Sequence, residues 1–238
     1  MLSLSVINNA RLFCAGLLLC CNSVVLADGM LPETTVVVLY EAQGEATINI
    51  KNTDPGPALL HSVVENVPED VEPLLIVTPP ITRVEAGETQ LVRFIATLKE
   101  PLKTQRLKRV SFEGIPQARG PGGATIGITL RQNLPLILHP KDLPVHHTPW
   151  ELLKWKRAGK SLTVHNDSAY VVRLEPQVQL LPQGGLASLP RTYVLPGEAL
   201  AVQVDGALEG VTGVEIRPAT LYGFSADSYR ALINADEG

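Results

Sequence analysis

Short runs of alternating apolar and polar residues recur through this chain, each bounded by glycine, proline, asparagine or aspartate. Such alternation places the apolar side chains on one face of a β-strand, and little of the sequence after residue 27 has the period of a helix. Seven runs fall within about 105 residues, a spacing typical of an immunoglobulin-like sandwich. The predicted strands are 36–40, 46–51, 59–67, 74–77, 90–98, 109–115 and 124–136.

A second set of runs follows a segment at 139–150 that is rich in proline and histidine. This segment has no apolar period, so we place a domain boundary near residue 143. The prediction is therefore an all-β chain with two immunoglobulin-like β-sandwich domains, 28–143 and 144–238. The strands of the second domain are expected at 161–166, 170–181, 198–205 and 213–218.

The first 27 residues are typical of a secretory signal peptide. Arg11 supplies a positive charge, residues 12–26 form an apolar run, and the small Ala27 marks the expected cleavage site. A membrane anchor is the alternative interpretation. It is disfavoured because Asn22 and Ser23 interrupt a run that is already short for a membrane span.

All three cysteines, Cys14, Cys20 and Cys21, lie in this leader. A lipid-anchored cysteine is disfavoured, because the bulky Leu19 precedes Cys20 where a small residue is expected. Cleavage after Ala27 would leave 211 residues with no cysteine and hence no disulfide, which fits a bacterial periplasmic protein. With 19 basic and 24 acidic residues, that chain is not expected to bind nucleic acid.

The run at 124–136 combines an apolar face with a proline. Ile126, Ile128 and Leu130 share one face of the predicted strand. Pro135 has no N–H to donate, so this strand is expected at a sheet edge. A long apolar edge is either an aggregation hazard or a surface on which another chain adds a strand. The alternative is that the three side chains face the core of their own domain.

Four segments, in this order, resemble the periplasmic pilus chaperones of the chaperone–usher pathway, the PapD-like family. TPPITRVEAGETQLVRF at 78–94 is similar to the family's Pro-Pro, arginine, turn and second arginine, which are Arg83 and Arg93 here. The other segments are FEGIP at 112–116, LILHP at 136–140 and HNDSAYVV at 165–172. The resemblance spans the chain after the leader and implies two domains set at an angle, like a boomerang.

The resemblance implies donor-strand complementation, in which the chaperone lends its edge strand to a pilin that lacks the last strand of its own sandwich. Ile126, Ile128 and Leu130 match the residues that fill the groove of the subunit. The implied partners are pilin or fimbrial subunits and an outer-membrane usher, and the implied location is the periplasm. No cofactor or nucleotide is expected. A bare edge could also pair the free chaperone with a second copy.

Two basic residues of the family are replaced here. The family holds the C-terminal carboxylate of the subunit with an arginine and a lysine in the cleft between the domains. Counted from Tyr40, the arginine's position is Val37, and counted from Pro140, the lysine's position is Pro135. Arg131 is a neighbouring base that could take over this role, and backbone N–H groups are the alternative.

The family's ion pair between the domains is also altered. Gln105 and His139 occupy two of its charged positions, while Asp227 is the acid that remains. We expect His139 to pair with Asp227 when the imidazole is protonated.

Other functions have weaker support in the sequence. His139, His146, His147 and His165 match no zinc-binding spacing, so we predict no metal site and interpret them as part of a solvated linker. The glycine-rich loop at 117–123 precedes a strand rather than a helix, which argues against a phosphate site. No G-x-S-x-G turn, acid pair or cysteine nucleophile is recognisable after the leader, so no enzyme is expected.

Two rival functions remain open from the residues. A secreted two-domain adhesin or pilus component would pair its edge strand within its own fibre. A carbohydrate-active β-sandwich would need an aromatic-rich groove with paired carboxylates, yet only 5% of the residues are aromatic. We expect Trp150 and Trp155 to pack at the entrance of the second domain.

Overall fold

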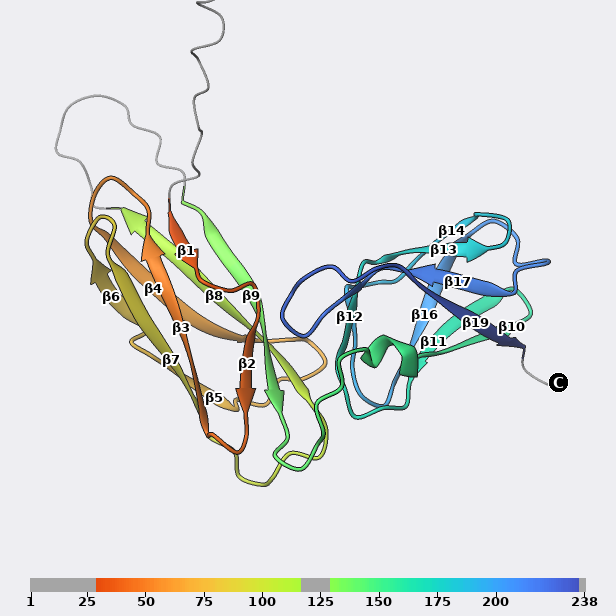
Figure 1. Ribbon diagram of the computed structural model, residues 1–238, viewed down its shortest axis with the longest axis horizontal. Coiled ribbons are helices and arrows are strands. Elements are labelled where there is room, and N and C mark those ends of the chain that lie inside the picture. Colours follow the sequence, from red (N-terminus) through yellow and green to blue (C-terminus); the bar gives the residue numbers. More distant parts are fainter. Residues whose placement is uncertain (1–28, 117–128, 236–238) are drawn as a thin grey trace, which may run out of the picture.

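Strands built from the alternating runs make up nearly all of the protein, which the computed structural model describes over residues 29–116 and 129–235. They form two lobes that lie at an angle to each other (Figure 1). A single turn of 3-10 helix, η1 (Pro149–Leu152), opens the second lobe. Within the described ranges, no helix is long and apolar enough to cross a membrane.

The first domain is a sandwich of two sheets. The four-stranded sheet has the order β1 (Met30–Pro32), β3 (Glu45–Asn52), β7 (Thr89–Ala96) and β5 (Leu75–Thr78). The five-stranded sheet has the order β2 (Val37–Tyr40), β9 (Arg131–His139), β8 (Arg106–Pro116), β4 (Ala58–Asn66) and β6 (Ile81–Val84). All neighbours are antiparallel except β2 and β9, which run parallel.

The core of the first domain lies between these sheets. Phe94 of β7 and Phe112 of β8 meet edge to face with ring centroids 6.5 Å apart, a favourable arrangement for aromatic rings. Leu134, Leu136 and Leu138 of β9 are buried in the same core, because alternate residues of a strand face the same side.

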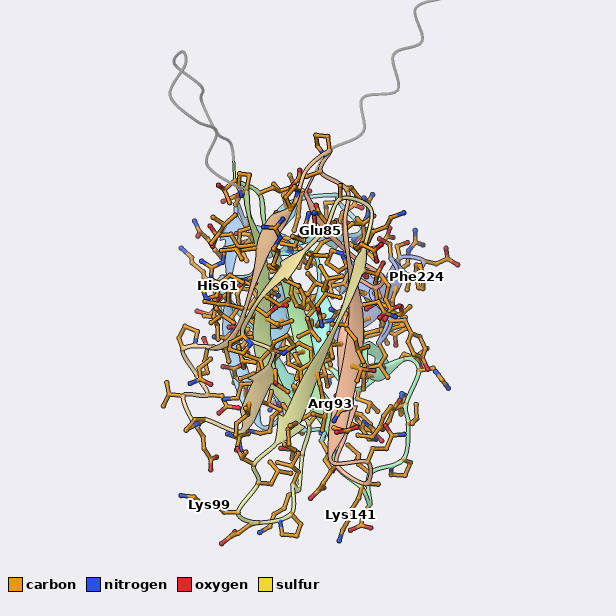
Figure 2. All side chains as sticks on the ribbon, turned by 90° about the vertical axis from the view of Figure 1, so that its left-hand side faces the viewer. His61, Glu85, Arg93, Lys99, Lys141 and Phe224 are labelled. Atoms are coloured by element: carbon orange, nitrogen blue, oxygen red, sulfur yellow. The ribbon has the colours of Figure 1, made fainter. Side chains whose placement is uncertain are left out.

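The outer face of the four-stranded sheet points away from the second domain. Figure 2 shows this side, with Arg93 on β7 and the second domain behind. Arg93 lies 3.6 Å from Glu45, and Arg83 donates to Glu85 at 2.7 Å. Both pairs are exposed, so the two arginines of the family-like segment are surface residues that contribute little to stability.

The second domain has hydrogen bonds that continue around a closed ring of strands. Its order is β10 (Lys154–Ala158), β11 (Ser161–Asn166), β16 (Glu198–Asp205), β14 (Leu186–Ser188), β13 (Gln177–Leu181), β17 (Gly213–Ile216) and β19 (Tyr229–Ala235). A separate three-stranded sheet contains β15 (Tyr193–Val194), β12 (Val172–Leu174) and β18 (Pro218–Ala219). Trp150 and Trp155 were expected to pack at the entrance of this domain, and both belong to its buried core.

The predicted class of two immunoglobulin-like sandwiches is confirmed, and some strands differ in detail. The runs at 161–166 and 198–205 coincide with β11 and β16. The run at 170–181 is two strands in different sheets, with Glu175 and Pro176 at the break. The last strand of the first domain begins within the predicted 124–136 but continues to His139.

The two domains meet through a small apolar cluster and several hydrogen bonds. Val36, Leu107 and Ile137 of the first domain pack with Val171 of the second. Gln105 links the domains twice: its backbone N–H donates to Ala169 O, and its Oε1 accepts from the N–H of Val171, both at 2.8 Å. The boundary near residue 143 stays a prediction.

Candidate functional site

Strand β9 has two halves with different neighbours. From Arg131 to Pro135 it pairs with β8 alone. From Leu136 to His139 it also pairs with β2, which runs parallel on its other side. Over residues 131–135 the predicted strand, 124–136, therefore has one open side, and β2 covers only its last residue and the continuation to His139.

Of the three predicted groove-filling residues, only Leu130 is described, and it lies immediately before this open edge. Ile126 and Ile128 are outside the described residues. Leu130 is described, and 45% of its surface is exposed. The buried core positions of β9 begin later, at Leu134. The structure thus leaves a large apolar side chain in solvent immediately before the half-paired part of the strand.

Arg131, the candidate anchor for a carboxylate, already has partners. Its guanidinium is paired with Glu65 of β4 and donates to Ser111 Oγ at 2.9 Å. Asn133 Nδ2 also approaches Glu65 at 3.5 Å. This network on the outer face of the sheet neutralises Arg131 within the chain.

The two positions that carry basic residues in the family have different surroundings. Val37 is 3% exposed and belongs to the core of the first domain, so its side chain does not face the cleft. Pro135 lines a cavity of about 300 Å³ between the two domains. Arg109 of β8 is the direct cross-strand partner of Pro135, and Arg173 of β12 lines the same cavity from the second domain.

These two arginines were not singled out as site residues from the sequence. Arg109 lies in the predicted strand 109–115 and Arg173 in the predicted strand 170–181, and only the packing of the domains brings them to one cavity. Burial, together with the positive charge of Arg109, lowers the pKa of Arg173 to about 10. The sequence contains no motif of basic residues at a fixed spacing that would have identified these two arginines as a site.

His139 has partners other than Asp227. It is 3% exposed, its Nδ1 lies 2.9 Å from Gln105 Nε2, and its Nε2 lies 2.8 Å from Leu143 O. Asp227 is exposed, and no contact joins it to His139. In the described structure, His139 is therefore linked to Gln105 instead of forming the expected ion pair with Asp227.

The interpretation of the histidines as a solvated linker is wrong for His139, which is buried at the end of β9. His146 packs its ring against Tyr170, with centroids 5.3 Å apart. In the part of the chain that the structure describes, no group of three or more histidine, cysteine or acidic residues is arranged to hold a metal ion.

A second polar link between the domains lies near the cavity. Glu69 of the first domain pairs with Arg191 of the second and accepts a hydrogen bond from Tyr193 Oη at 2.8 Å. The Arg191 guanidinium lies 4.7 Å from the centre of the Tyr193 ring. Burial, followed by the hydrogen bond to Glu69, raises the pKa of Tyr193 to about 12.

Two family models match the chain. The model described as "Pili and flagellar-assembly chaperone, PapD N-terminal domain" matches residues 29–144. The model described as "Pili assembly chaperone PapD, C-terminal domain" matches residues 148–227. Together with two sandwich domains joined at an angle, these matches show that the chain belongs to the PapD-like family of pilus assembly chaperones.

Individual relatives agree with this assignment. The chain is 40% identical over 205 residues to the uncharacterized fimbrial chaperone YhcA of Escherichia coli K12, covering 86% of this chain and 90% of that protein. It is 26% identical over 208 residues to the chaperone protein caf1M of Yersinia pestis, covering 78% of each.

Solved structures share the fold. A chain from the complex of the Salmonella enterica SafA pilin with the SafB chaperone superimposes with a TM-score of 0.72 at 21% identity, covering 87% of this chain and 98% of that one. The CupB2 chaperone of Pseudomonas aeruginosa gives 0.68 at 22% identity, covering 86% and 100%.

Proposed function

We propose that this protein binds and caps fimbrial subunits by lending them the strand that leads into β9, and delivers them to an outer-membrane usher in the periplasm. The observation that carries the proposal is the open edge of β9 at residues 131–135, where only β8 is paired. Unpaired N–H and C=O groups along such an edge are a template for another strand. The leader would be removed after Ala27 on export.

The residues that precede β9 in the sequence alternate between apolar and polar, as expected for a strand that fills an apolar groove. If the alternation of β9 continued back through residues 126–130 when a subunit binds, Ile126, Ile128 and Leu130 would share the face of Leu134, which lies in the core. A subunit stacked on this end of the first domain would therefore continue the core with its own groove. Three buried side chains at about 1.5–3 kcal/mol each would stabilise the complex before the cost of ordering the strand is subtracted.

Release to the usher would need no ATP in this mechanism. The subunit would exchange a borrowed strand for a strand from another subunit that fills its groove better. The free energy of that exchange would drive assembly.

The test is the capture of a fimbrial subunit co-expressed from the same gene cluster. Ile128→Asp should reduce the amount of co-purified subunit at least tenfold, because a carboxylate cannot enter an apolar groove without a partner. Thr129→Asp is the matched control, since the neighbouring side chain points to the opposite face, and capture should stay near the wild-type amount. Normal capture by Ile128→Asp would contradict the proposal.

The same purification separates a chaperone from a fibre component. A chaperone should stay soluble and elute with one subunit per copy. A two-domain adhesin or pilus component would instead polymerise through its own edge strand.

A further inference from the structure

The cavity between the domains collects positive charge. Arg109, Arg173 and Arg217 line it, with Glu175 as the acidic residue among its lining side chains. Arg217 lies at the exposed rim, 3.9 Å from Glu175. Arg109 and Arg173 are less exposed and come from opposite domains. The cavity therefore contains two cations in addition to the Arg217–Glu175 pair.

Neither inner arginine has an ion-pair partner among the described residues. Arg109 donates from Nε to Asn133 Oδ1 at 2.5 Å and from Nη2 to Asn133 O at 2.8 Å. Arg173 donates from Nη2 to Thr220 O at 2.8 Å. These neutral acceptors fix the direction of each guanidinium and bring no negative charge into direct contact with it.

The surroundings make this placement costly in the free protein. Burial lowers the pKa of Arg109, while the charge of Glu65 acts in the opposite direction, but Glu65 is already paired with Arg131. Arg173 loses hydration and also faces the charge of Arg109. Two desolvated cations that repel each other in a cavity are typical of a site for an anion.

The cavity lies where a strand added at the open edge of β9 would end, so the end of that strand can supply the anion. A strand that pairs with the open edge of β9 can advance only to Pro135, because β2 occupies the edge from Leu136 onward. Pro135 itself lines the cavity. Because Arg109 is the cross-strand partner of Pro135, their side chains lie on the same face of the sheet.

From this geometry we infer that Arg109 and Arg173 together bind the C-terminal carboxylate of a subunit strand that runs parallel to β9 and ends at Pro135. A guanidinium presents paired N–H donors that match a carboxylate, and excluding water strengthens each charge-assisted hydrogen bond. The inference rests on the proposed function. It assigns carboxylate binding to Arg109 of β8 and Arg173 of β12, and not to the family positions Val37 and Pro135 or to Arg131.

The experiment changes only the charge of the chain end. A labelled fimbrial subunit from the same gene cluster is prepared with a free C-terminal carboxylate or, by protein ligation, with a C-terminal amide. Each form is diluted from denaturant into the purified full-length chaperone, and the affinity is measured by titration. The wild type should bind the carboxylate form at least tenfold more tightly than the amide form.

Variants of the chaperone locate the anchor. Arg109→Gln and Arg173→Gln should each reduce the preference for the carboxylate, and the double variant should bind both forms equally. Arg173→Lys, which restores the charge, should recover part of the preference. Arg217→Gln is the control that should keep the full preference, because Arg217 lines the same cavity but lies beside Glu175 of its own chain.

The outcomes separate the two claims. If neither form of the subunit binds the wild type, or if Ile128→Asp leaves binding of both forms unchanged, the proposed function fails. If Ile128→Asp weakens both forms but the wild type binds carboxylate and amide equally, the anchor is overturned while the proposed function stands. A preference that persists in the folded double variant, checked by circular dichroism, also overturns the anchor.

Discussion

At the residue scale, the first domain buries a cation. Lys108 is 0% exposed, and its Nζ donates to the carbonyl oxygens of Asp70 and Glu72 at 2.7 and 2.8 Å. It also lies 2.9 Å from the carboxylate of Asp70, which accepts from Arg106 Nε at 2.6 Å. Burial alone would raise the pKa of Asp70, but the hydrogen bonds and charges of Arg106 and Lys108 outweigh it and lower that pKa.

This network predicts a loss of stability in acid. A carboxyl with a lowered pKa in the folded state stabilises the protein above its unfolded pKa of about 4, and this contribution disappears as the pH falls below that value. Asp70→Asn should lower the free energy of unfolding at pH 7 by about 3–5 kcal/mol, because Lys108 keeps its buried charge. It should also flatten the decline of stability between neutral pH and pH ~3.

Urea unfolding at a series of pH values measures both effects. Asp167→Asn is the control, because Asp167 is an exposed carboxylate paired with Lys154. Its unfolding midpoint at pH 7 should stay near that of the wild type. Equal losses in the two variants would show that the buried network has no special role.

At the element scale, sequence alternation predicts strands well where they are long enough to have a period. The runs at 46–51 and 161–166 match strands within a residue or two. The strands β14 and β15 contain three and two residues, too few to show a period, and they form because longer neighbours offer hydrogen-bonding edges. The coverage of β9 by β2 depends on a parallel pairing between the two ends of the domain, which no local pattern encodes.

The unequal halves of β9 predict unequal hydrogen exchange. Residues 136–139 have neighbours on both sides, whereas at 131–134 every second N–H points to the open edge. In the free protein, the amides at 131–134 should exchange faster than those at 136–139 when measured by mass spectrometry. Adding a subunit should slow exchange at 131–134, and equal protection of both halves before binding would contradict the open edge.

At the scale of the whole molecule, the domains are held together mainly by polar contacts around a small apolar cluster. Gln105 is 4% exposed and uses its side chain and backbone to bind Val171, Ala169 and His139. The sequence indicated that this family position is altered, but the replacement network required the coordinates. Arg109 and Arg173 were missed for a related reason, since the cavity that both line forms only when both domains are in place.

Gln105→Ala should weaken the link between the domains. It leaves the buried N–H of Val171 without its acceptor, a loss of about 1–3 kcal/mol. Both tryptophans lie in the second domain, so their fluorescence reports that domain while circular dichroism reports both. The two unfolding curves should differ more in Gln105→Ala than in the wild type, and the exposed control Gln203→Ala should behave like the wild type. Unchanged curves in Gln105→Ala would contradict this role.

The start of β2 opposite Leu136 has one further consequence. If a subunit strand binds as proposed, its last residue would stop at this point, and the positions of its other residues along β9 would be fixed by their distance from that end. Different subunits would then need only the same spacing of apolar side chains from their C-terminal ends, and the rest of their sequences could vary.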